Sequence, residues 1–163
     1  MSCFTRILVA TDGTAACETA LVDATNLARH LNARLLVLSV ARGAVTPEAA
    51  IGGVIDPFGA AEEAAVGLAE QQREAARRDA GRAADEAADR ARAAGADAEA
   101  IVWEGVPGEA IVAAAEEEHV DMVVVGSHGR DAVGRLLLGS VSEYVVRHSK
   151  RPVLVARPER GHR

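Results

Sequence analysis

The sequence contains few aromatic residues, because Phe4, Phe58, Trp103 and Tyr144 are the only ones among 163 residues. Single-stranded nucleic acids are commonly bound by stacking successive bases on aromatic side chains. Positive charge is also scarce, since 24 acidic residues outnumber 18 basic ones and leave a formal net charge of -6. That charge has the wrong sign for binding a phosphate backbone. We therefore expect no nucleic acid partner.

Cysteine is nearly absent, and Cys3 and Cys17 form neither a disulfide framework nor a CxxC site. Both are interpreted as small, idle thiols. Long hydrophobic runs are missing as well, because charged residues, glycine or proline interrupt every apolar stretch before the roughly 20 residues needed to cross a bilayer. No signal-peptide pattern precedes the first apolar stretch. These absences predict a soluble cytoplasmic protein with no membrane partner.

Histidines with the paired spacing of a metal site are also lacking. His30, His119, His148 and His162 are isolated in the sequence and are interpreted as surface or helix-end residues. We therefore predict no structural metal and no protein-held catalytic metal.

What the chain does have is enough apolar sequence for one core, with 49% hydrophobic and 26% charged residues. This composition and length predict a single globular domain. We expect the domain to span residues 1–157 and residues 158–163 to form a flexible C-terminal tail.

Short β-branched-rich runs alternate with helical patterns along the chain. The expected strands are Arg6–Ala10, Arg34–Val40, Glu99–Trp103, Met122–Val125 and Pro152–Ala156. The expected helices are Ala15–Leu31, Ala61–Ala94, Pro107–His119 and Ser140–Ser149. The second of these helices is unusually long, so fraying or a break is expected near Gly67 or Gly81. The segment Ala41–Ala60, rich in glycine and proline, is expected to be a long loop.

This alternation predicts an α/β fold with a doubly wound parallel sheet. In such a sheet, ligands bind beyond the carboxyl ends of the strands, at the point where the strand order reverses. The loops that follow Ala10, Val40 and Val125 are therefore the candidate binding loops.

The loop after Val125 carries the most informative motif, Gly126-x2-Gly129-x9-Gly139-Ser140, which leads directly into a helix. Glycines let the backbone approach a ligand closely, and a helix start offers free amides to an anion. The motif therefore favours a phosphate-binding loop. Gly134-x4-Gly139-Ser140 resembles the glycine frame of a P-loop but has no lysine before the serine, and no G-x-G-x-x-G follows the first strand.

Asp12 lies at the end of the first strand, and two roles are open for it. Its carboxylate could accept hydrogen bonds from ribose hydroxyls, as acidic residues do in dinucleotide sites. It could instead be the N-cap of the next helix. His128 and Arg130 flank Gly129, and a cation there could stabilise phosphate charge, with histidine able to act as an acid or base near neutral pH. For His128, a solvated loop position is the favoured interpretation.

With these motifs, the chain resembles the universal stress protein family over nearly its whole length, from Ile7-Leu-Val-Ala-Thr-Asp-Gly13 to Arg151-Pro-Val-Leu-Val-Ala156. The glycine motif is similar to that of the ATP-binding branch of this family. The resemblance implies a single Rossmann-like domain of the adenine nucleotide alpha hydrolase type, with strand order 3-2-1-4-5 and helices on both faces. It also implies a homodimer through the last strand, Pro152–Ala156.

The family's nucleotide site can be carried over residue by residue. The resemblance implies that Asp12 lies near the ribose and that the backbone of Val40 lies beside adenine. The residues implied around the phosphates are Gly126, Gly129, Gly139, Ser140 and Ser142. The residues implied to line the same pocket are Thr11, Val125, Arg130 and Val141. The implied ligand is ATP, with ADP and AMP as alternatives and magnesium held through the phosphates.

Three functions remain open at this point. The first is an ATP-binding stress-response or signalling module with unknown protein partners and at most slow hydrolysis. The second is an enzyme that turns over ATP or phosphorylates itself, with Ser140 or Ser142 as acceptor. The third is an interaction protein that is free of nucleotide or that binds AMP or a cyclic nucleotide. Apart from Asp12, no carboxylate is placed for phosphoryl-transfer chemistry. The sequence itself therefore favours a function without catalysis.

Overall fold

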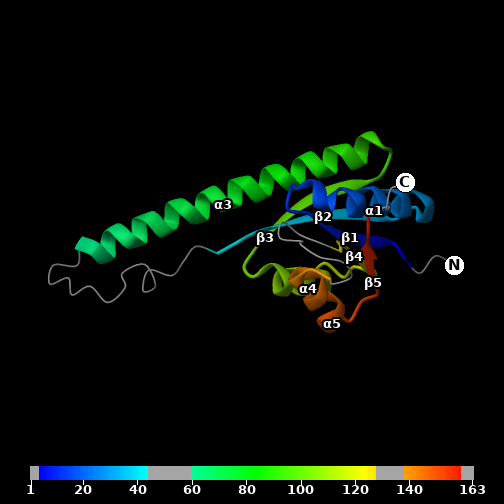
Figure 1. The fold of residues 1–163 in the computed structure, drawn as a ribbon. Coiled ribbons are helices and arrows are strands. Elements are labelled where there is room, and N and C mark those ends of the chain that lie inside the picture. Colours follow the sequence, from blue (N-terminus) through cyan, green and yellow to red (C-terminus); the bar gives the residue numbers. More distant parts are fainter. Residues whose placement is uncertain (1–3, 44–59, 128–137, 159–163) are drawn as a thin grey trace, which may run out of the picture.

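The structure is a computed structural model that describes residues 4–43, 60–127 and 138–158. Its centre is a five-stranded parallel sheet in the order β3-β2-β1-β4-β5 (Figure 1). The strands are β1 (Arg6–Ala10), β2 (Arg34–Ala41), β3 (Ala98–Glu104), β4 (Met122–Gly126) and β5 (Val153–Ala156). The predicted fold class and strand order are confirmed, and each predicted strand end is found to within a single residue.

Helices cover both faces of this sheet (Figure 1). On one face lie α1 (Glu18–Leu31) and α3 (Ala60–Ala93), and on the other lie α4 (Pro107–Glu117) and α5 (Ser140–His148). The predicted helix from Ala15 begins as a short 3-10 turn, η1 (Ala15–Cys17), before α1 starts at Glu18. Within the described helices, none combines the length and the apolar character needed to span a membrane.

The strands are buried on both sides, which explains why they consist of nearly continuous apolar runs. Successive side chains of a strand point to opposite faces. Ile7, Leu35 and Val124 therefore join the cluster on the α1 and α3 side. Leu8, Leu36 and Val123 join the cluster on the α4 and α5 side. The core is thus two layers of aliphatic side chains separated by one sheet.

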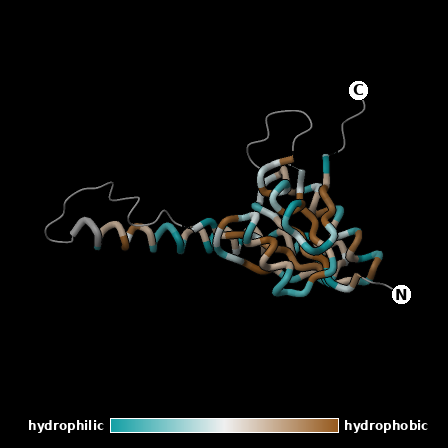
Figure 2. The backbone as a smooth tube through the Cα atoms, turned by 90° about the horizontal axis from the view of Figure 1, so that it is seen from below, coloured by the Kyte–Doolittle hydropathy of each residue, from teal (hydrophilic) through white to brown (hydrophobic). Residues whose placement is uncertain are grey.

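The long helix α3 corrects one expectation, because it runs unbroken for 34 residues through Gly67 and Gly81. An isolated glycine in a helix costs only about 1 kcal/mol relative to alanine, which is less than the loss of helix packing. The second half of α3 packs on the sheet through buried alanines, namely Ala80, Ala84, Ala87, Ala88 and Ala91. Its first half extends clear of the body of the protein (Figure 2).

Candidate functional site

The carboxyl ends of three strands meet at one edge of the sheet, because β1 lies between β2 and β4. Thr11 and Asp12 follow β1, Val40 lies near the end of β2, and Val125 and Gly126 end β4. After β1 the chain continues to β2, which pairs with β1 on one side, whereas β4 pairs with β1 on its other side. This is the switch point at which doubly wound sheets bind their ligands.

The start of α5 is tied to the end of β4 by backbone hydrogen bonds. The Gly139 amide donates to the Ser127 carbonyl at 2.8 Å. The Ser142 hydroxyl donates to the Gly139 carbonyl at 2.9 Å and is 3.3 Å from the Ser127 carbonyl. These contacts bring Gly126, Gly139, Ser140, Val141 and Ser142 together. Gly129 and Arg130, with His128, belong to the same predicted loop but lie outside the described residues.

The N-terminus of α5 faces this edge without a side-chain cap from any described residue. Its first helical hydrogen bond runs from the Glu143 amide to the Gly139 carbonyl at 2.8 Å. The amides of Ser140, Val141 and Ser142 precede that bond, so they have no partner within the helix. Such amides and the helix dipole attract anions. Ser140 is exposed, whereas Ser142 is 3% exposed and its proton points to carbonyl groups.

Asp12 is held by its own turn. Its Oδ1 accepts hydrogen bonds from the Thr14 amide at 3.0 Å, the Thr14 hydroxyl at 2.5 Å and the Cys17 thiol at 3.2 Å. Thr14 is the residue before η1 and Cys17 the residue before α1, so Asp12 is not an N-cap by position. The N-cap interpretation was therefore wrong in position, although the carboxylate does accept a hydrogen bond from a turn amide. A role toward ribose stays a prediction.

Thr14 and Cys17 are contacts that sequence reasoning missed. Burial raises the pKa of the Cys17 thiol to about 11, so the thiol is protonated near neutral pH and donates to Asp12. The Asp12-x-Thr14 spacing, which is typical of an aspartate that closes its own turn, could have identified Thr14. The contact of Cys17 depends on the 3-10 turn and had no comparable signal.

Thr11 and Gly13 shape the loop around Asp12. Thr11 is 7% exposed, and its hydroxyl accepts a hydrogen bond from the Gly13 amide at 3.1 Å. Gly13 has φ +74°, and a Cβ there would lie 3.1 Å from the Cβ of Ala83 on α3. The loop therefore needs glycine at this position both for its backbone conformation and for its close approach to α3.

The described residues contain no group of three or more His, Cys, Asp or Glu side chains that could hold a metal ion. His30 and His148 lie in the last turns of α1 and α5, and each Nδ1 is within 2.8 Å of the carbonyl four residues earlier. Their interpretation as helix-end residues is confirmed.

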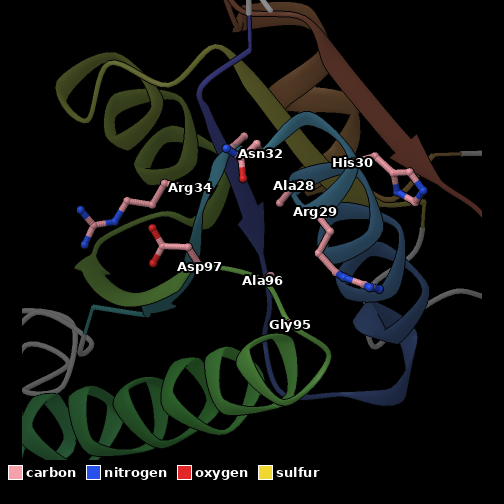
Figure 3. A pocket seen from close by; sticks show the side chains of 9 residues that line it. Ala28, Arg29, His30, Asn32, Arg34, Gly95, Ala96 and Asp97 are labelled. Carbon is pink, nitrogen blue, oxygen red and sulfur yellow. The ribbon is translucent and has the colours of Figure 1, made fainter.

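A hollow of about 440 Å³ lies at the opposite, amino edge of the sheet (Figure 3). Its charged side chains do not converge, because Arg34 and Asp97 lie on one side of it and Arg29 and His30 on the other. Arg34 is paired with Glu99 at 2.7 Å. None of the residues that the sequence predicts for the site lines this hollow.

The fold and the carboxyl edge together define a class of protein, namely α/β proteins that present a glycine-flanked helix start at the switch point of a parallel sheet. The model of the universal stress protein family matches residues 4–157. The chain belongs to the universal stress protein family.

Several relatives show how close the chain is to known members. Universal stress protein YxiE of Bacillus subtilis is 31% identical over 154 residues, which cover 94% of this chain and 99% of YxiE. Universal stress protein MJ0577 of Methanocaldococcus jannaschii is 47% identical over 57 residues, a match that spans only 35% of each chain. The solved structure of MJ0577 has a TM-score of 0.68 at 28% identity and covers 97% of this chain and 99% of its own.

A further solved structure shows a universal stress protein in complex with cAMP. It has a TM-score of 0.62 and 30% identity and covers 94% of this chain and 97% of its own. A nucleotide complex is thus known for a structural relative that is 30% identical to this chain.

Proposed function

We propose that this chain is a cytoplasmic ATP-binding universal stress protein, a nucleotide-dependent module of stress response or signalling. The observation that carries the proposal is the uncapped start of α5, fixed beside the end of β4 by Ser127 and Gly139. It supplies amides without a partner within the helix, suited to phosphates, at the edge where Asp12 is also held. The cAMP complex of a relative supports an adenine nucleotide as the ligand class.

In this proposal each residue has a stated part. Asp12 accepts hydrogen bonds from the ribose, and the backbone of Val40 lies beside adenine. Backbone amides at the start of α5 bind phosphate oxygens, with the exposed Ser140 hydroxyl as a further donor. Because the Ser142 proton is directed to carbonyl groups, Ser142 contributes through its amide. Magnesium is held through the phosphates.

The remaining residues assigned to the site belong to its walls and its glycine-rich loop. They are Thr11, Val125, Gly126, Gly129, Gly139, Arg130 and Val141.

The outer edge of the sheet supports the further proposal of a homodimer. Pro152 and Ala156 direct their carbonyls to β4, where the Val123 and Ser127 amides bond them at 2.9 and 2.8 Å. Because backbone groups of alternate residues face opposite sides of a strand, those of Val153 and Val155 face outward. An exposed strand edge of this kind pairs readily with a second chain.

A first experiment identifies the ligand itself. The purified protein is denatured, and the released small molecules are analysed by chromatography and mass spectrometry. The emptied, refolded protein is then titrated with ATP, ADP, AMP and cAMP by calorimetry. Preferential binding of ATP supports the proposal. Preference for AMP or cAMP identifies instead a cyclic-nucleotide or AMP-responsive interaction protein, and rapid ATP turnover identifies an enzyme.

A second experiment tests the start of α5. Ser140→Pro removes one amide donor, and proline is tolerated at the first position of a helix. Gly139 has φ -64° and ψ 156°, which suits a residue before proline. We expect ATP affinity to fall about tenfold, as the loss of a hydrogen bond to a charged group predicts. The matched control, Ser140→Ala, keeps the amide and changes affinity less. Equal affinities for Ser140→Pro and the wild type would contradict the assignment of phosphates to this helix.

A further inference from the structure

A row of apolar side chains crosses the carboxyl edge of three strands. Ala10 ends β1, and Val40 of β2 is in register with Trp103 of β3. Ala10 is in register with Leu38, which points to the same face as Val40 because side chains alternate along a strand. Ala10, Val40 and Trp103 all pack against the cluster on the α4 and α5 side. They therefore lie on one face of the sheet, at the carboxyl ends of three neighbouring strands.

This row is incompletely covered by the described residues. Deeper in the same strands and on the same face, Leu8, Leu36 and Leu38 are at most 1% exposed. The row at the strand ends, Ala10, Val40 and Trp103, is only half-buried. A tryptophan offers a large flat face, and partial cover of such a face leaves area for a planar ligand.

The position of the row matches the chemistry beside it. Ala10 adjoins Thr11 and Asp12 in the chain. Val141, in the first turn of α5, packs against the same cluster as Trp103. The edge therefore offers an apolar face, a carboxylate and a helix N-terminus within one region. These three suit the base, the ribose and the phosphates of a nucleotide.

We infer that Trp103 is a base-contacting residue, whose indole lies against the purine ring of a bound adenine nucleotide. This inference rests on the function proposed above and adds a specificity-determining side chain to it. Stacking of a base on an aromatic side chain contributes measurably to affinity. The same contact makes binding depend on the base as well as on the phosphates.

The end of β3 is held rigidly enough to act as a platform. The Gly105 amide donates to the Ala41 carbonyl of β2 at 3.0 Å. Glu104 is bound by Arg73 at 2.6 Å and by Arg77 at 3.1 Å, both from α3. These contacts fix the backbone that follows Trp103 on the β2 side and on the α3 side.

The test uses the fact that Trp103 is the only tryptophan. Tryptophan emission of the full chain is followed while ATP or tripolyphosphate, which has no base, is added. We expect ATP to change the emission and tripolyphosphate to leave it nearly unchanged. Calorimetry then compares the wild type with Trp103→Ala, Trp103→Phe and the control Val102→Ala. Val102 is the adjacent, 40% exposed residue and points to the opposite face of the sheet.

We expect Trp103→Ala to lower ATP affinity about tenfold and to leave tripolyphosphate affinity unchanged. Trp103→Phe keeps most of the ATP affinity, and Val102→Ala keeps all of it. If the wild type binds ATP with no change in emission and Trp103→Phe and Trp103→Ala bind as the wild type does, the inference is overturned while the proposed function stands. If the wild type binds no adenine nucleotide, both are overturned. Should Trp103→Ala not fold, the wild-type emission and Trp103→Phe still decide.

Discussion

The two edges of the sheet are built from the same strands, yet they differ in how their polar groups are used. At the amino edge, the Asp121 carboxylate accepts hydrogen bonds from the Thr5 and Arg6 amides at 2.7 and 2.9 Å. At the carboxyl edge, the Asp12 carboxylate accepts hydrogen bonds from Thr14 and Cys17 of its own turn, and α5 begins without a side-chain cap from the described residues. The amino edge joins distant segments through Asp121, whereas the carboxyl edge presents a helix start that no described side chain caps.

The comparison shows that a hollow alone does not indicate a binding site. The hollow at the amino edge is lined by Arg29, His30 and Asp97, but α1 is already closed there by Asn32, which has φ 55° and whose amide bonds the last turn. At the carboxyl edge, a helix start that has no side-chain cap among the described residues coincides with half-buried apolar groups. What distinguishes the carboxyl edge is the combination of a helix start that attracts anions with an apolar face beside it.

The largest effect on ATP affinity is expected from replacing the aspartate at the carboxyl edge, with the aspartate at the amino edge as the control. We expect Asp12→Ala to weaken ATP binding by about 10- to 100-fold, because it removes a charged hydrogen-bond acceptor. Asp121→Ala is the matched control and leaves ATP affinity unchanged in the folded protein. Calorimetry with ATP and with tripolyphosphate separates the contributions. Equal losses of both ligands in Asp12→Ala would mean that Asp12 only supports the fold.

The second prediction concerns stability at the amino edge. Asp121→Asn is expected to lower the free energy of unfolding by about 1 kcal/mol near neutral pH, because the hydrogen bonds of a charged acceptor are weakened. Hydrogen bonding from the Thr5 amide holds the pKa of the Asp121 carboxyl below its usual range. A lowered pKa stabilises the fold above the unfolded-state pKa, and this stabilisation is lost as pH falls.

Denaturant unfolding of the wild type and Asp121→Asn at several pH values measures this dependence. The difference between the two proteins is expected at pH 6 to 7. It is expected to shrink as pH falls below the ordinary aspartate pKa of about 4 and toward the lowered pKa of Asp121. A difference that stays constant across this range would argue against the charge of Asp121 as its cause.

The third prediction sharpens the comparison by adding the outer edge at β5. Val155→Pro removes an outward amide without removing a hydrogen bond to β4, because the groups of Val155 face away from β4. We expect the dimer dissociation constant to rise about tenfold or more, as measured by light scattering or sedimentation. Val155→Ala is the control for lost side-chain packing. A dimer unchanged in Val155→Pro would refute pairing through this edge.

The smallest effect is expected at the amino-edge hollow. Arg29→Ala removes a charged side chain from its lining and is expected to change neither ATP affinity nor the released ligand. An affinity loss comparable to that of Asp12→Ala would show that the two edges are coupled. Titration under the same conditions as for Asp12→Ala makes the two results directly comparable.

Much of the fold was predictable from the sequence because it depends on local patterns. The buried strands stand out as apolar runs, and Pro107 and Gly95 mark where α4 begins and where the chain turns after α3. The expected break in α3 was wrong. Packing of Ala87, Ala88 and Ala91 holds the half that contains Gly81 on the sheet, and at Gly67 the cost of one isolated glycine, about 1 kcal/mol, does not break the helix. The helix propensities of neighbouring residues do not reveal how a helix packs on the sheet.

The motif residues of the candidate site were predictable from the sequence, whereas the contacts that these residues make were not. The glycines and Ser140 could be read directly, and so could Asp12 at a strand end. The Asp12 contacts with Thr14 and Cys17 depend on the turn between them. The register of Val40 with Trp103 depends on the pairing of β2 with β3, which no spacing along the chain reveals.

The sequence by itself determined the alternation of strands and helices, the glycine motif and the family resemblance, because each is encoded by residues close together in the chain. Only the tertiary structure decided which ends of α5, β1 and β3 share an edge and which polar groups remain open there. The physical reason is that hydrogen-bond satisfaction and burial depend on neighbours from distant segments, as Ser127 with Gly139 and Trp103 with Val40 demonstrate.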